Sequence, residues 1–250
     1  MGFLDFLFDK EKAQRNQYRK LRKSLTNMYV QAGEREYAIQ SLRELGTPEA
    51  VDVLLARFEE TSPNHTTDAE EKQYVYSVLV DLGRRKDADV VTVITEYLKR
   101  INENINWPLK VLTDLTSRED MIGLIVELFE ASDIEYLRNP EKKRELMLRA
   151  AEFKAPELAE QIIRFLEDDN ETIRFLAVDA LMAQDEDALA EEPLRKRLGE
   201  EDSLRILQKL ADIFVDHQDW RIPDDEVEDV KLGLPDGYGL NKDGRITKTR

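Results

Sequence analysis

The sequence predicts an all-α fold, a right-handed α-α superhelix of about five to six helix pairs. Apolar residues recur at i, i+3, i+4 and i+7 spacing along most of the 250 residues, and no stretch keeps the alternation of a strand. Two helices joined by a turn recur every 31 to 38 residues, with turns near Leu45, Leu82, Leu115, Phe153 and Gln184. Because one pair cannot bury its own apolar face, we expect the pairs to stack.

The first clear pair is joined by the turn Gly46–Glu49. Glycine suits the left-handed residue that ends a helix, threonine can cap the next one, and proline is preset for its first turn. The glutamate then faces the positive end of the helix dipole. The apolar face of the second helix contains Val51, Leu54, Leu55 and Phe58.

Four further copies of this pair follow. Residues 111–128 and 149–166 align with residues 41–58 without a gap. The copy at 79–97 needs two extra residues in its turn, and the last copy runs from 170 to 198. A compact bundle of unrelated helices is the alternative, and the ungapped matches argue against it.

Residues 169–181 closely resemble the first helix of a HEAT repeat. An acidic turn precedes an Ile-Arg pair, and small residues then lead to an Ala-Leu pair. Pro48 and Pro156 open second helices, as is common in that family. The resemblance implies a HEAT-like α-solenoid over residues 34–216. It implies little about function, because HEAT arrays serve unrelated tasks.

The array divides the chain into three predicted parts. Residues 1–12 form an apolar N-terminal segment, 13–220 the HEAT-like solenoid, and 221–250 an acidic, extended C-terminal tail. In this tail, 224–229 contains five acids in six residues, and 241–244 is typical of a hairpin turn. Each end of the array is expected to be covered by a single helix, with Tyr18 and Leu25 on the inner face of the first and Ser203 capping the last.

Composition excludes several classes of function. The chain has 53 acids against 37 bases, a net charge of −16, so free nucleic acid is an unsuitable partner. With no cysteine and two histidines, it offers little for metal binding or acid–base catalysis. The sequence therefore predicts no enzyme activity, no metal and no cofactor. No secretory signal or apolar span is evident, so we expect a cytoplasmic protein.

The charge is unevenly distributed along the chain. Residues 1–33 carry a net charge of +4, from seven bases and three acids. Residues 157–202 carry −10, from 15 acids and five bases. An acidic surface of this kind favours a protein partner with a basic patch and speeds their encounter.

The individual residues that could carry chemistry are better explained as structural. His65 lies in a polar connection and His217 near a helix end, while Trp107 precedes Pro108 as a packing residue at a helix start. The segment 239–250 resembles a calcium-binding EF-hand loop, but Gly239 and Arg250 stand where carboxylates are required. No calcium site is expected.

The apolar N-terminal cluster has two interpretations. It consists of Phe3, Leu4, Phe6, Leu7 and Phe8, and seven bases follow it. The cluster either folds back to cover the first repeat or serves as an exposed docking peptide. In the second case it also suits peripheral attachment to a membrane surface, where the bases would meet anionic lipid.

The sequence thus favours a non-catalytic scaffold that binds a protein or peptide on the concave face of the solenoid. Asp52, Arg57 and Glu127, which lie between core positions, would supply the polar part of that face. Two alternatives stay open. One is a lyase-type enzyme or chromophore-handling subunit, since phycobilin lyases resemble the chain in length and repeat type. The other is a membrane-surface adaptor that uses the N-terminal cluster.

Overall fold

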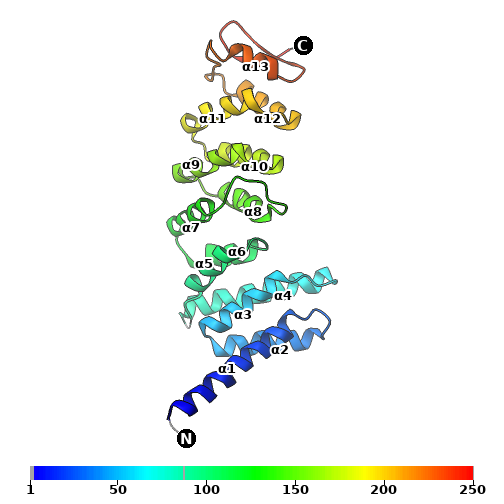
Figure 1. The fold of residues 1–250 in the computed structure, drawn as a ribbon, viewed down its shortest axis with the longest axis vertical. Coiled ribbons are helices and arrows are strands. Elements are labelled where there is room, and N and C mark those ends of the chain that lie inside the picture. Colours follow the sequence, from blue (N-terminus) through cyan, green and yellow to red (C-terminus); the bar gives the residue numbers. More distant parts are fainter. Residues whose placement is uncertain (1–2, 87, 250) are drawn as a thin grey trace. The chain divides into compact units, whose positions relative to one another are not determined.

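The structure is a computed structural model that describes residues 3–86 and 88–249, with the side chains of residues 3–9 and 11 left out (Figure 1). The chain forms two compact units, Met1–Met121 and Ile122–Arg250, which we term unit 1 and unit 2.

Unit 1 consists of stacked helices. First helices pack on first helices (α2 on α4, α4 on α6), and second helices likewise (α3 on α5), while α1 covers α2 and α3. The helices are α1 (Phe3–Thr26), α2 (Ala32–Leu45), α3 (Pro48–Glu59), α4 (His65–Arg85), α5 (Val90–Arg100), α6 (Asn106–Leu115) and the start of α7 (Arg118–Glu130).

Unit 2 repeats this stacking. Here α8 packs on α10 and α10 on α12, while α9 packs on α11. The elements after α7 are α8 (Glu141–Ala150), α9 (Pro156–Arg164), the 3-10 helix η1 (Phe165–Glu167), α10 (Glu171–Met182), α11 (Asp187–Glu200), α12 (Leu204–Asp216), α13 (Val227–Gly233), β1 (Tyr238–Leu240) and β2 (Ile246–Lys248).

The predicted all-α fold of repeated helix pairs is confirmed. Gly46 ends α2 in the left-handed region at φ 56°, and Pro48 opens α3. The Thr47 hydroxyl accepts a hydrogen bond from the Ala50 N–H at 3.2 Å. Each predicted turn thus joins two helices. The right-handed sense of the superhelix stays a prediction.

The core of each unit is formed by the residues that define the repeat. Because these side chains return to one face every turn, stacking removes them from water. In unit 1 the fully buried members include Leu42, Val51, Leu54, Leu55, Phe58 and Leu112. In unit 2 they include Ile125, Leu128, Ile162, Ile173 and Leu181.

Buried ion pairs connect successive repeats in unit 2. The Lys143 ammonium on α8 lies 2.6 Å from the Asp168 carboxylate before α10, and both side chains are buried. Arg174 on α10 donates at 2.8 Å to Glu201, which follows α11. In both cases a cation of a first helix binds a carboxylate at the next connection.

The N-terminal residues do not form a separate segment. One helix, α1, runs from Phe3 to Thr26, so the predicted boundary at residue 12 falls inside it. Its backbone makes no turn that would fold residues 3–12 back over the first repeat (Figure 1). The predicted inner face is confirmed, because Tyr18 and Leu25 are buried.

The prediction of an extended C-terminal tail is wrong. Residues 227–233 form α13, and β1 pairs antiparallel with β2. Ile222, Val230 and Ile246 are buried. The acidic run folds because Val230 supplies an apolar anchor and Glu226 is neutralised by Arg195 at 2.7 Å.

The predicted hairpin turn is confirmed. Gly244 has a φ of +72°, and the Asn241 side chain accepts hydrogen bonds from the N–H groups of Asp243 and Arg245. The Gly244 carbonyl accepts a hydrogen bond from the Ile222 N–H at 2.7 Å. This bond ties the hairpin to the segment after α12.

Candidate binding groove

An open groove of about 630 Å³ lies in unit 1 between α1, α3 and α5. Clefts between about 300 and 1,000 Å³ are typical of ligand-binding sites. Helices α3 and α5 are the second helices of the first two repeats. The wall from α1 was not predicted.

One face of α1 forms the first wall of the groove. Arg15, Tyr18, Arg19 and Arg22 line it, at spacings that place four residues on one side of a helix. The Tyr18 hydroxyl lies 2.8 Å from the Thr47 hydroxyl, within hydrogen-bond distance. This contact fixes α1 against the start of α3 and therefore fixes the position of the three arginines.

Asp52 lies on the floor of the groove between arginines from two helices. Its carboxylate is 3.7 Å from the Arg22 guanidinium of α1, and it forms an ion pair with Arg100 of α5. A single negative charge is therefore shared by two cations. Asp52 is a predicted site residue that the structure places in the groove, and it acts as a bridge between the walls of the groove.

Arg15 and Arg19 differ from these paired arginines. Both are exposed, and neither forms an ion pair with any residue that the structure describes. The floor beside them is apolar, because Val53 is only 6% exposed and Val93 is half-buried. The groove thus combines a basic rim with an apolar floor.

The lining of the groove is more positive than the chain. It contains four arginines and three acids, Glu49, Asp52 and Glu96. The whole chain carries −16. Local positive charge of this kind attracts carboxylates at short range, although the field of the whole protein opposes it at long range.

Arg57 is not available to a partner, contrary to the prediction. Its side chain is fully buried, and its guanidinium donates to Asp68 at 2.8 Å, to Glu71 at 3.0 Å and to the Glu60 carbonyl at 3.0 Å. The partners lie at the end of α3 and on α4. Arg57 therefore joins two helices inside the first repeats.

The Arg57 cluster extends to two further cations. Glu71 also accepts hydrogen bonds from Arg35 of α2, and Asp68 pairs with Lys72 at 2.9 Å. Burial raises the pKa of Asp68, but hydrogen bonds from Ser62, Arg57 and Lys72 outweigh it and hold the pKa below its ordinary value. The cluster is a structural contact between three helices.

The other predicted site residues lie elsewhere. Glu127 is exposed on α7 and belongs to unit 2. Phe3, Leu4, Phe6, Leu7 and Phe8 belong to α1, but their side chains lie outside the described residues. Their role in docking stays a prediction.

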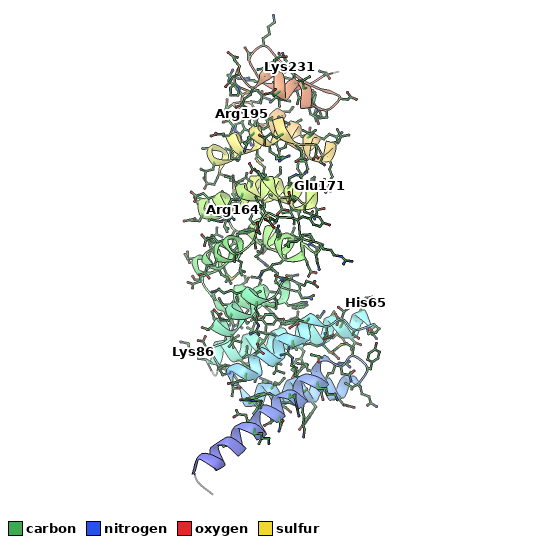
Figure 2. All side chains as sticks on the ribbon, in the orientation of Figure 1. His65, Lys86, Arg164, Glu171, Arg195 and Lys231 are labelled. Atoms are coloured by element: carbon green, nitrogen blue, oxygen red, sulfur yellow. The ribbon has the colours of Figure 1, made fainter. Side chains whose placement is uncertain are left out.

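Trp107, His217 and His65 have the structural positions that the sequence suggests rather than positions in a site. Trp107 stacks on Phe58 at the start of α6, with ring centroids 5.7 Å apart and planes 3° apart. His217 caps α12 and its Nδ1 lies 2.8 Å from the Ile213 carbonyl. His65 is exposed, although it begins α4 rather than lying in a connection (Figure 2). No cluster that could hold a metal ion occurs among the described residues.

Many acids of residues 157–202 are neutralised within unit 2. Glu167 pairs with Lys196 at 2.7 Å, and Glu201 pairs with both Arg174 and Arg197. A cleft of about 200 Å³ lies beside these residues, and its lining includes the exposed acids Glu167 and Glu200. The acidic surface is thus smaller than the sequence count suggests.

The stacked helix pairs define a helical repeat protein with an open groove in unit 1. Residues 34–60, which span α2, the Gly46 turn and α3, match the family model described as PBS lyase HEAT-like repeat. This match shows that one helix pair of the array, α2 and α3, is a HEAT-like repeat. Comparisons with curated proteins and with solved structures gave no match. No helix among the described residues is long and apolar enough to cross a membrane.

Proposed function

We propose that this chain is a non-catalytic, cytoplasmic scaffold that binds a segment of another protein in the groove between α1, α3 and α5. The observation that carries the proposal is the pair Arg15 and Arg19, which form no ion pair with a described residue and lie beside an apolar floor. A guanidinium binds a carboxylate through two parallel hydrogen bonds. The groove therefore suits a segment that combines acidic and aliphatic side chains.

The energetics of such binding follow from the groove. Aliphatic side chains would cover the half-buried Val93, which removes apolar surface from water. Carboxylates at the exposed rim would add selectivity more than affinity, and salt would screen them. Binding is therefore expected to be moderate and to weaken as ionic strength rises.

The predicted basic partner would meet unit 2. Glu192 and Glu200 are exposed acids in the lining of the smaller cleft beside α11, where Glu167 is already paired with Lys196. Lys196 and Arg197 offset part of this charge. We assign the predicted basic partner to this cleft, and the acidic segment to the groove of unit 1.

The two alternative functions, a chromophore-handling subunit and a membrane-surface adaptor, predict different observations. The matched repeat is named for a lyase, so a chromophore-handling subunit is the second candidate. It would bind a chromophore, and its absorbance spectrum would then extend into the visible. A membrane-surface adaptor would bind anionic vesicles through residues 3–8, and removal of those residues would abolish the binding.

A peptide titration tests the groove. The probes are two dye-labelled helical peptides of equal length, one with glutamates and leucines on one face and one with lysines in place of the glutamates. We expect the acidic peptide to raise fluorescence anisotropy with the native chain and to lose at least about tenfold in affinity with R15E/R19E. The variant K20E/K23E carries the same charge change on α1 outside the groove lining and should bind as the native chain does. Equal binding of both peptides, or equal loss in both variants, would refute the proposal.

A further inference from the structure

The acidic C-terminal segment of the chain carries an exposed apolar side chain that its own fold does not use. Leu232 on α13 is 87% exposed, whereas Val230 two residues earlier is buried. Asp229 lies three residues before Leu232, so both lie on one side of the helix. A single exposed leucine is common on protein surfaces, so it indicates a docking element only together with the charges beside it.

The acids of this element differ in their pairing. Glu226 binds Arg195 of α11, and Glu228 binds Lys231 at 3.2 Å. Asp225 and Asp229 are exposed and form no ion pair with any residue in the described part of the chain. They remain available to cations of a partner.

These features match those of the groove in unit 1. The groove has an apolar floor and two arginines without an ion pair to a described residue. The segment 224–232 has two such aspartates, Asp225 before α13 and Asp229 within it, and the exposed Leu232. We propose that the α13 segment of one copy, residues 224–232, docks into the α1–α3–α5 groove of a second copy. Asp225 and Asp229 would pair with Arg15 and Arg19, and Leu232 would cover the half-buried Val93. The inference rests on the proposed function of the groove.

This contact joins different surfaces of the two copies. The α13 segment on unit 2 of one chain contacts the groove on unit 1 of the next chain. Because these are two different surfaces, the contact is heterologous and leads to rings or open chains. A helix of seven residues buries far less area than a stable interface. The association is therefore weak, and it is salt-sensitive because its charged pairs lie at the surface.

Sedimentation velocity of the full chain tests the inference. At about 25 mM salt the weight-average sedimentation coefficient should rise with protein concentration, and at about 500 mM the rise should disappear. A native chain that stays monomeric at low salt over the whole concentration range overturns the inference. If the acidic peptide still binds that chain, the proposed function stands; if the peptide fails as well, both fall.

Charge-reversal variants test whether the groove and the α13 segment are the two surfaces in contact. R15D/R19D and D225R/D229R should each lower the association constant at least about tenfold. Their equimolar mixture should associate again, because each supplies the surface that the other lacks. K20D/K23D and E157R/E160R change the net charge equally outside these surfaces and should behave as the native chain does. Failure of the mixture to associate, with both variants folded by circular dichroism, contradicts the assignment.

Discussion

The Lys143 ammonium lies 2.6 Å from Asp168 Oδ2 in the interior of unit 2, and both side chains are buried. The ammonium also donates to the Glu135 carbonyl at 3.0 Å, and the other carboxylate oxygen of Asp168 accepts from the Asn170 N–H at 2.9 Å. The pair therefore joins α8, the connection before it and the start of α10.

Removal of one partner should destabilise unit 2 strongly. Lys143→Met leaves the Asp168 carboxylate buried without its cation, and we expect a loss of about 3–5 kcal/mol in the free energy of unfolding. Urea unfolding followed by circular dichroism measures the loss. Lys196→Met, which breaks the exposed pair with Glu167, is the matched control and should change stability little. Equal effects of the two substitutions would show that Lys143 is not buried in solution.

Glu201 should make unfolding depend on pH. Burial raises its pKa, but the hydrogen bonds from Arg174 and from the Ser203 N–H, together with the charge of Arg197, lower it from 4.5 to about 2. Because the folded pKa is depressed, the stabilisation is present above about pH 4.5 and is lost as pH falls toward 2. Glu201→Gln should cost about 2 kcal/mol at pH 7 after allowance for solvent screening, and the difference should shrink between pH 4.5 and 2. A difference that stays constant over this range would contradict the ion pair.

Two helix glycines should respond differently to alanine. A Cβ at Gly83 would lie 2.5 Å from a terminal methyl of the half-buried Leu115, which must then shift, whereas one at Gly123 meets nothing within 4 Å. Gly123→Ala should stabilise α7 by up to about 1 kcal/mol. Gly83→Ala should gain less, because displacement of Leu115 offsets part of the helix propensity, and the full gain should return in the background of Leu115→Ala. Thermal unfolding of the four variants measures this, and an equal gain at both glycines in the native background would rule out the close approach of α4 and α6.

The C-terminal hairpin should depend on Gly244. A Cβ there would lie 2.6 Å from the Ile222 carbonyl oxygen, a backbone atom, at a φ of +72°. Gly244→Ala should therefore cost about 1–3 kcal/mol locally and release residues 221–249. Limited proteolysis should cut this variant faster than the native chain in that segment. Unchanged cutting would mean that the hairpin is not docked.

The repeated turns could be predicted because their signals are local. Gly46, Thr47 and Pro48 each have a position-specific role at a helix boundary, and all three hold those roles in the structure. The later predicted turns, near Leu82, Leu115, Phe153 and Gln184, also lie within three residues of a helix end. Ser203 stands at the N-cap position before α12 as predicted, but its hydroxyl donates to Glu171 at 3.0 Å and does not cap the helix. Glu171 lies 32 residues earlier, so no local pattern indicates this bond.

The candidate site could be predicted only in part. Periodicity marks Arg57 as a polar residue between core positions, but its partners Asp68 and Glu71 lie on the next helix, which no local pattern indicates. The arginines of α1 had a detectable signal in their helical spacing with Tyr18. The sequence could not show that this face lies beside Asp52, because that depends on how α1 packs.

Hydrogen–deuterium exchange with the acidic peptide tests the central claim most directly. The account predicts slower exchange on peptide binding in residues 15–22 of α1, 48–53 of α3 and 92–100 of α5, with no change in R15E/R19E. Protection confined to α9 and α11, or no protection at peptide concentrations that saturate the anisotropy signal, would contradict it.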